Sequence, residues 1–221
     1  MTKTTFERRT FTETVELRGE GDRKVAAGHA AVFGKLSQNL GGFVERVAPG
    51  AFAQTLQEQD IRALFNHHED HVLGRLSAGT LRMVEDGDGL SYEVDLPDTS
   101  AGRDVAELLR RGDVTGSSFG FRVIEDEWGE TEAGFPLRTL KQVSLRDVGP
   151  VTFPAYTDAT SALRSLAEAR SLDLSTVVAA AESGALRSVI SPTHPVEDEK
   201  NNEEAVEDRA TPIVHRRPVV L

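Results

Sequence analysis

The stretch "GTLRMVEDGDGLSYEVDLP", residues 79–97, constrains the fold more than any other part of the chain. Two runs in which apolar and polar residues alternate, 80–84 and 90–96, flank a turn rich in Asp and Gly. Alternation with a period of two is typical of a strand with one buried face, and such a turn joins neighbouring antiparallel strands. The stretch therefore predicts a β-hairpin.

Strand-like segments lie on both sides of this hairpin. Residues 5–17 and 24–34 have the short period and the β-branched or aromatic content of strands. Residues 61–65 form a short apolar strand that leads into a polar turn, and residues 135–156 supply two more strand-like runs whose ends are restricted by prolines. We therefore expect a domain dominated by strands.

Two helices are predicted inside this strand-rich region. A short one starts near Ala51, after a Pro-Gly turn. A longer one covers residues 100–111, where Thr99 or Ser100 can cap the first turn and Gly112 provides a C-terminal stop. Its apolar positions Val105, Leu108 and Leu109 share one face.

The character of the chain changes after about residue 157. Two alanine-rich segments with a helical pattern come first, and a Pro-rich, strongly acidic segment follows, which is typical of disorder. We expect a compact domain over residues 1–160 and a helical, then flexible, acidic tail over residues 161–221.

Composition excludes several classes of protein. The 221 residues include no cysteine, so disulfides, thiolate nucleophiles and sulfur-based zinc sites are ruled out. A formal charge of −11 argues against a protein that binds nucleic acid by neutralising phosphates. No apolar run is long enough for a transmembrane helix, and the N-terminus lacks the apolar core of a secretory signal. We expect a soluble, acidic protein that acts inside a cell.

The segment "GDVTGSSFGFRV", residues 112–123, places Ser117 and Ser118 between glycines. A serine hydroxyl becomes a nucleophile only beside a base, usually a histidine that a third group orients. Three histidines cluster in "NHHEDH", residues 66–71, where a strand gives way to a turn. From spacing alone this cluster is either the source of that base or an ordinary solvated turn.

Two other chemistries fit parts of the same residues. His67 and His71 are four residues apart, as in helical zinc motifs, but His68 stands where such a motif requires glutamate. The letters Gly116, Ser118 and Gly120 match the nucleophile elbow of α/β-hydrolases, which needs a strand before the serine and a helix after it. Here the predicted order is the reverse, so the elbow interpretation fails.

Asp147 is a candidate third member, because it lies among apolar residues of a strand-like run. Alternation would leave such an acid exposed, and a partner would hold it inward. Many other acids would serve equally well, and spacing does not choose between them.

Four blocks of the chain, in this order, resemble the prohead maturation proteases of tailed bacteriophages. They are "ERVAPGAF", "ALFNHHEDHVLGRLSAGTLRM", "GLSYEVDLPDTSAGRDVAELLRRGDVTGSSFGFRV" and "LRDVGPVTFPAY", and the resemblance covers about residues 25–160. This family is distantly similar to the herpesvirus assemblins. The resemblance implies an α+β fold, with a compact and mainly antiparallel β-barrel surrounded by helices.

The resemblance also implies a Ser-His-acid triad. The histidine after the asparagine of an "NH" step is His67, the serine before "FGF" is Ser118, and the acid before "VTFPA" is Asp147. Many relatives carry methionine at the position of Ser117, glutamate at that of Asp147 and serine at that of Gly149. Ser117 or His68 could therefore take over a role in the triad.

The expected mechanism is acyl transfer at a peptide carbonyl, with no cofactor and no metal. Backbone N–H groups of the glycine-flanked loop would stabilise the oxyanion, and Arg138 and Arg146 are weaker candidates for this task. The implied substrates are the scaffolding protein, the major capsid protein and the chain itself, cut within the immature capsid in the host cytoplasm. A homodimer is possible, and neither nucleic acid nor membrane is an expected partner. The alternative is an assembly factor that keeps the fold and has lost activity.

Overall fold

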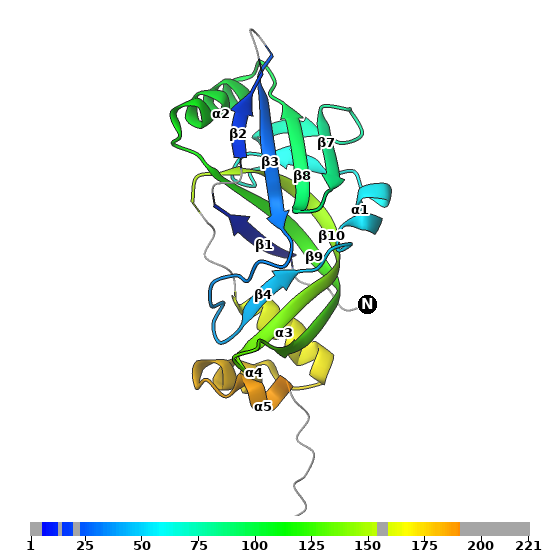
Figure 1. Cartoon of the computed structure of the whole chain (residues 1–221), viewed down its shortest axis with the longest axis vertical. Helices are drawn as coiled ribbons and strands as arrows, with labels where there is room; N and C mark the ends of the chain where they lie inside the picture. The colour runs from blue at the N-terminus through cyan, green and yellow to red at the C-terminus, as the bar shows by residue number, and fades with distance from the viewer. Residues whose placement is uncertain (1–5, 13–14, 20–22, 154–158, 191–221) are drawn as a thin grey trace, which may run out of the picture.

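A computed structural model describes residues 6–12, 15–19, 23–153 and 159–190 (Figure 1). Its strands form two sheets, which pack around a shared apolar core. In the larger sheet the order is β1-β9-β10-β5-β6, with β4 also paired to β10, and in the smaller one it is β2-β3-β8-β7. The strands are β1 (Phe6–Phe11), β2 (Val15–Arg18), β3 (Val25–Val32), β4 (Val44–Val47), β5 (Arg62–Leu64), β6 (Val72–Arg75), β7 (Leu81–Glu85), β8 (Gly89–Asp95), β9 (Gly116–Glu130) and β10 (Pro136–Val151).

Most neighbouring strands run antiparallel, and β10 pairs in parallel with β4 and β5. The outer strands of the larger sheet, β1 and β6, do not pair with each other, so the described strands leave this sheet open. The structure is thus a mixed α and β fold made mostly of strands, and the expected closed barrel is not found. Beyond β1 and β5, the outer parts of β9 and β10 continue together with β4 (Figure 1).

The predicted hairpin is confirmed as β7 and β8. The longer predicted helix is α2 (Ser100–Arg111), where the Thr99 hydroxyl accepts a hydrogen bond from the Gly102 N–H at 3.2 Å. Gly112 ends this helix in the left-handed conformation, at φ 77°, as its position predicted. The short helix after Ala51 is also present, as α1 (Ala53–Glu58).

Three further helices pack on the outer parts of β9 and β10. They are α3 (Ala159–Arg170), α4 (Leu174–Glu182) and α5 (Leu186–Ile190), and they lie at the end of the molecule opposite α2 (Figure 1). They form a second apolar cluster together with Phe43 and Trp128, whose rings are 5.0 Å apart. The expected domain boundary at residue 160 stays a prediction, and the acidic segment after residue 190 lies outside the described residues.

None of the helices in the described part of the chain is long and apolar enough to cross a membrane.

Candidate active site

Three side chains from distant parts of the chain meet on the outer face of the larger sheet. His67 follows β5, Ser118 lies on β9 and Asp147 lies on β10. The Nε2 atom of His67 is 2.7 Å from the Ser118 Oγ, and the Nδ1 atom of the same ring is hydrogen-bonded to the Asp147 carboxylate. The structure therefore brings together the three residues that the family resemblance implied, in the connectivity of a serine–histidine–acid triad.

Strand pairing fixes which serine faces this site. Ser118 pairs with Gly149 of β10, and Gly120 pairs with Asp147. Side chains two residues apart on a strand share one face, so the Ser118 hydroxyl and the Asp147 carboxylate lie on the same side of the sheet. Ser117 points to the opposite face, into the core.

The buried Ser117 hydroxyl has partners of its own. It lies 2.8 Å from the hydroxyl of Tyr92 and 3.3 Å from the carbonyl oxygen of Gly149. Burial raises the pKa of Tyr92 above its usual range, so this phenol stays neutral. Ser117 is thus a core residue that contacts none of the described histidines, and it does not take the place of Ser118 in this structure.

The turn that carries His67 is held in an unusual conformation. Asn66 and His67 have φ angles of 54° and 58°, in the left-handed region that few non-glycine residues adopt. Asn66 fastens this turn to the end of β10, because its backbone N–H donates to the Pro150 carbonyl at 3.0 Å and its side chain bonds Thr152 in both directions. These contacts direct the imidazole toward Ser118.

His68 and His71 lie apart from this arrangement. Both are exposed, and their rings contact each other at 5.5 Å. His68 therefore does not compete with His67, and His67 cannot ligate zinc together with His71 while its two ring nitrogens are engaged by Asp147 and Ser118. Among the described residues, the one grouping with metal-ligand spacing is His29, Asp86 and Asp88, on the other sheet. His194 and His215 lie outside the described residues.

Strand β1 lies directly against the serine. Thr10 pairs with Ser118, and the Ser118 hydroxyl is 2.8 Å from the carbonyl oxygen of Arg9, which can accept its proton. Ser118 has 0% of its surface exposed. A hydroxyl has a single proton, so the Arg9 carbonyl and the His67 Nε2 compete to accept it.

A buried network of charges fastens β1 to the rest of the sheet. Arg9 donates to Glu45 and Glu7 at 2.5 Å and 2.7 Å, and Arg138 donates to Glu7, Glu45 and Asp126 at 2.9, 3.1 and 2.7 Å. Burial raises the pKa of Glu7, but the charges and hydrogen bonds of Arg138 and Arg9 outweigh it and hold that pKa below its usual range. Sequence reasoning missed this network because its partners are up to 131 residues apart.

The network excludes Arg138, which was one candidate for stabilising the oxyanion. Arg138 has 0% of its surface exposed and is committed to three carboxylates, so it is not available to a substrate. The expected glycine-flanked loop is also absent, because residues 116–120 belong to β9 and pair with β10, and residues 117–120 also pair with β1 on the other side. Sheet pairing thus engages the backbone of this stretch.

Position 120 must be a glycine, because neighbouring atoms lie too close to leave room for a side chain. A Cβ atom at this position would lie 2.5 Å from the Phe6 ring and 2.7 Å from an Asp147 carboxylate oxygen. Only a residue without a side chain leaves the carboxylate room to reach His67.

Comparison with known proteins assigns the chain to a family. Residues 11–173 match the caudovirus prohead serine protease family. The prohead protease of Enterobacteria phage HK97 is 29% identical over 150 residues, which are 66% of this chain and 62% of that protein, so the chain spans about three fifths of the length of this relative. A solved structure, the bacteriophage T4 capsid assembly protease, matches 68% of this chain and 99% of its own at 11% identity and a TM-score of 0.48. With three quarters of its length matched by the family, the chain belongs to the caudovirus prohead serine proteases.

Proposed function

We propose that this protein is a serine endopeptidase of capsid maturation, with Ser118 as nucleophile, His67 as general base and acid, and Asp147 as the group that orients the imidazole. The observation that carries the proposal is the pair of contacts on one ring: Nε2 at 2.7 Å from the Ser118 Oγ, and Nδ1 bonded to Asp147. Membership of a serine protease family supports it.

Each atom then has a defined task. Nε2 of His67 removes the Ser118 proton as the Oγ attacks a peptide carbonyl, and it returns that proton to the leaving amine. The acyl-enzyme is then hydrolysed by a water activated in the same way. Asp147 accepts the Nδ1–H, which keeps the ring in the tautomer with a free Nε2 and stabilises the imidazolium. The side chains of His67 and Asp147 are only 6% and 4% exposed, so this charge pair acts with little solvent screening.

The burial of Ser118 adds one requirement for the reaction with a substrate. Because Ser118 has no exposed surface and its hydroxyl contacts the Arg9 carbonyl, a substrate carbonyl reaches the Oγ only when the backbone at Arg9 moves and His67 stays in place. Such a movement also removes the carbonyl that competes with His67 for the proton.

The proposed substrates are the scaffolding protein and the major capsid protein, cut inside the immature capsid, together with the chain's own acidic tail. The test is co-expression with the capsid and scaffolding proteins of the same phage, followed by mass spectrometry of all products. Ser118→Ala and His67→Ala should abolish cleavage, and Asp147→Asn should slow it by about 10⁴-fold. Ser117→Ala is the matched control, since it removes the neighbouring hydroxyl and leaves the triad intact.

Circular dichroism of each variant separates loss of chemistry from loss of fold. Cleavage that persists in Ser118→Ala would overturn the assignment of the nucleophile. If the wild type never cleaves and capsids still require the protein, the chain is an assembly factor that has kept the protease fold. Loss of cleavage upon adding a chelator, with Ser118→Ala still active, would instead favour the zinc interpretation.

A further inference from the structure

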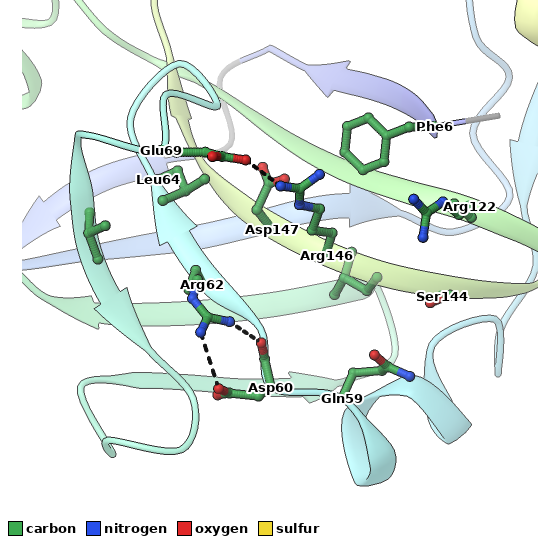
Figure 2. Close-up of a pocket in the computed structure, with 12 residues that line it drawn as sticks. Phe6, Gln59, Asp60, Arg62, Leu64, Glu69, Arg122, Ser144, Arg146 and Asp147 are labelled. Carbon is green, nitrogen blue, oxygen red and sulfur yellow. Dashed lines mark hydrogen bonds and ion pairs between the residues drawn. The ribbon is translucent and has the colours of Figure 1, made fainter.

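A cavity of about 410 Å³ opens beside the candidate triad (Figure 2). Asp147 forms part of its wall, and its other walls come from β1, β5, β6, β9, β10, the turn after β5 and the segment that joins α1 to β5. The cavity therefore lies on the same outer face of the sheet as Ser118, and a polypeptide bound along this face would place side chains in it. It is larger than a single amino acid side chain needs.

Three guanidinium groups line this cavity, from Arg62, Arg122 and Arg146. The acids in its wall already have partners. Asp60 is paired with Arg62 and Arg75, Glu69 is paired with Arg146, and Asp147 is bonded to His67.

Arg122 differs from the other two arginines. Within the described residues its guanidinium has no ion-pair or hydrogen-bond partner, and its side chain is exposed. Figure 2 shows Arg122 and Arg146 on the same side of the cavity as Phe6. The Arg146 guanidinium lies 5.5 Å from the centre of the Phe6 ring, a cation–π distance, and it has N–H groups beyond those that bind Glu69. Two arginines thus present donors to whatever enters between them.

Strand geometry sets the distance from the nucleophile. Ser118, Gly120 and Arg122 lie in one row on β9, so Arg122 is four residues from Ser118, or about 13 Å at roughly 3.3 Å per residue. An extended substrate has the same rise. With the reach of the arginine side chain included, the cavity receives a substrate side chain about two to four residues from the scissile bond.

We propose that this cavity is the subsite that selects an acidic side chain, Glu or Asp, of the polypeptide substrate, with Arg122 as its principal contact and Arg146 beside it. The inference rests on the proposed protease function. A carboxylate between two guanidiniums forms charge-assisted and potentially bidentate hydrogen bonds, whereas Lys or Arg would be repelled by the uncompensated Arg122. The chain carries a matching segment of its own in residues 197–208, which contain seven acids and one lysine.

The first experiment profiles cleavage sites. The full chain, Arg122→Gln and the control Arg110→Gln are incubated with a peptide library prepared from a digested bacterial proteome, and the new termini are sequenced by mass spectrometry. Arg110 makes the matched change of charge on α2, where it is exposed, pairs with Glu107 and does not line the cavity. The wild type and Arg110→Gln should show Glu or Asp enriched at one position two to four residues from the cut, and Arg122→Gln should lose this enrichment. Cleavage without an acidic preference, or a preference that Arg122→Gln retains, overturns the inference and leaves the protease function standing.

The second experiment measures binding without catalysis. In the Ser118→Ala protein, fluorescence anisotropy follows a labelled peptide of residues 195–209 and a matched peptide with every Glu replaced by Gln and every Asp by Asn. The acidic peptide should bind at least about tenfold more tightly, and adding Arg122→Gln should remove most of that difference while Arg110→Gln leaves it unchanged. Equal binding of the two peptides overturns the subsite. Selective binding that depends on Arg122, in a protein whose wild type never cleaves, refutes the protease function and leaves the acidic site standing.

Discussion

Replacing Arg138 by methionine tests the buried charge network. In the wild type this side chain is fully buried and bonds Glu7, Glu45 and Asp126 at 2.7 to 3.2 Å. Glu7 and Glu45 are themselves 2% and 3% exposed, so the variant leaves two carboxylates in the interior with Arg9 as their remaining cation. Removing one partner of a buried ion pair costs about 3–5 kcal/mol, because the other charge stays desolvated.

The free energy of unfolding in urea should therefore fall by about 3–5 kcal/mol, and the melting temperature by about 6–20 °C. Arg111→Met is the matched control, since Arg111 pairs with Asp113 at 2.8 Å with both side chains exposed, and it should change stability little. A double variant, Arg138→Met with Glu7→Gln, should recover part of the loss, because it removes one of the stranded charges.

The pH dependence of stability gives a further test of the charge network, with a predicted direction. The pKa of Glu7 is held below 4.5 in the folded wild type, so its contribution to stability is present above pH 4.5 and is lost as the pH falls through the folded value. Without Arg138, burial dominates and the charged form destabilises the fold. The difference in stability between wild type and Arg138→Met should thus be largest at pH 7 and narrow below about pH 4.5. Equal stability of Arg138→Met and Arg111→Met, or a gap that widens in acid, would refute the argument.

Two other variants separate packing from chemistry. Ser117→Ala leaves the buried Tyr92 hydroxyl without its partner at 2.8 Å, so urea unfolding should show a loss of about 1–3 kcal/mol that adding Tyr92→Phe partly restores, at an unchanged cleavage rate. A cleavage rate that falls with Ser117→Ala would count against a purely structural role. Gly120→Ala places a methyl group against the Phe6 ring and the Asp147 carboxylate, so cleavage should drop at least about tenfold while circular dichroism stays native. An active Gly120→Ala would mean that Asp147 does not need its observed position.

Local signals predicted the elements well. The hairpin of β7 and β8, the Thr99 cap and the Gly112 stop of α2 depend on residues within a few positions of each other, and each was found where the pattern placed it. The full lengths of β9 and β10, 15 and 16 residues, were not predicted, and their outer parts pack against helices that follow them in the chain.

The residues of the site also include some that local patterns could not place, because their positions depend on distant partners. Alternation alone left Asp147 either exposed or held inward by a partner, and the structure buries it on the outer face of the sheet, where His67, 80 residues away, bonds it. The inward charges of β1 could not be foreseen either, since an isolated strand with Glu7 and Arg9 on its core face looks unfavourable until Glu45 and Arg138 are brought to it. Long-range partners decide such positions, and no local pattern encodes them.

The order of the site residues along the chain has a consequence for synthesis. Asp147 is the last of the three to leave the ribosome, and β10, which carries it, lies between β9 and β5 and holds the histidine turn through Pro150. A nascent polypeptide that has emerged only as far as Ser118 possesses a hydroxyl and an imidazole but neither the acid nor the strand that unites them. Under the proposed function, no cut can therefore precede the synthesis of β10, which completes the larger sheet.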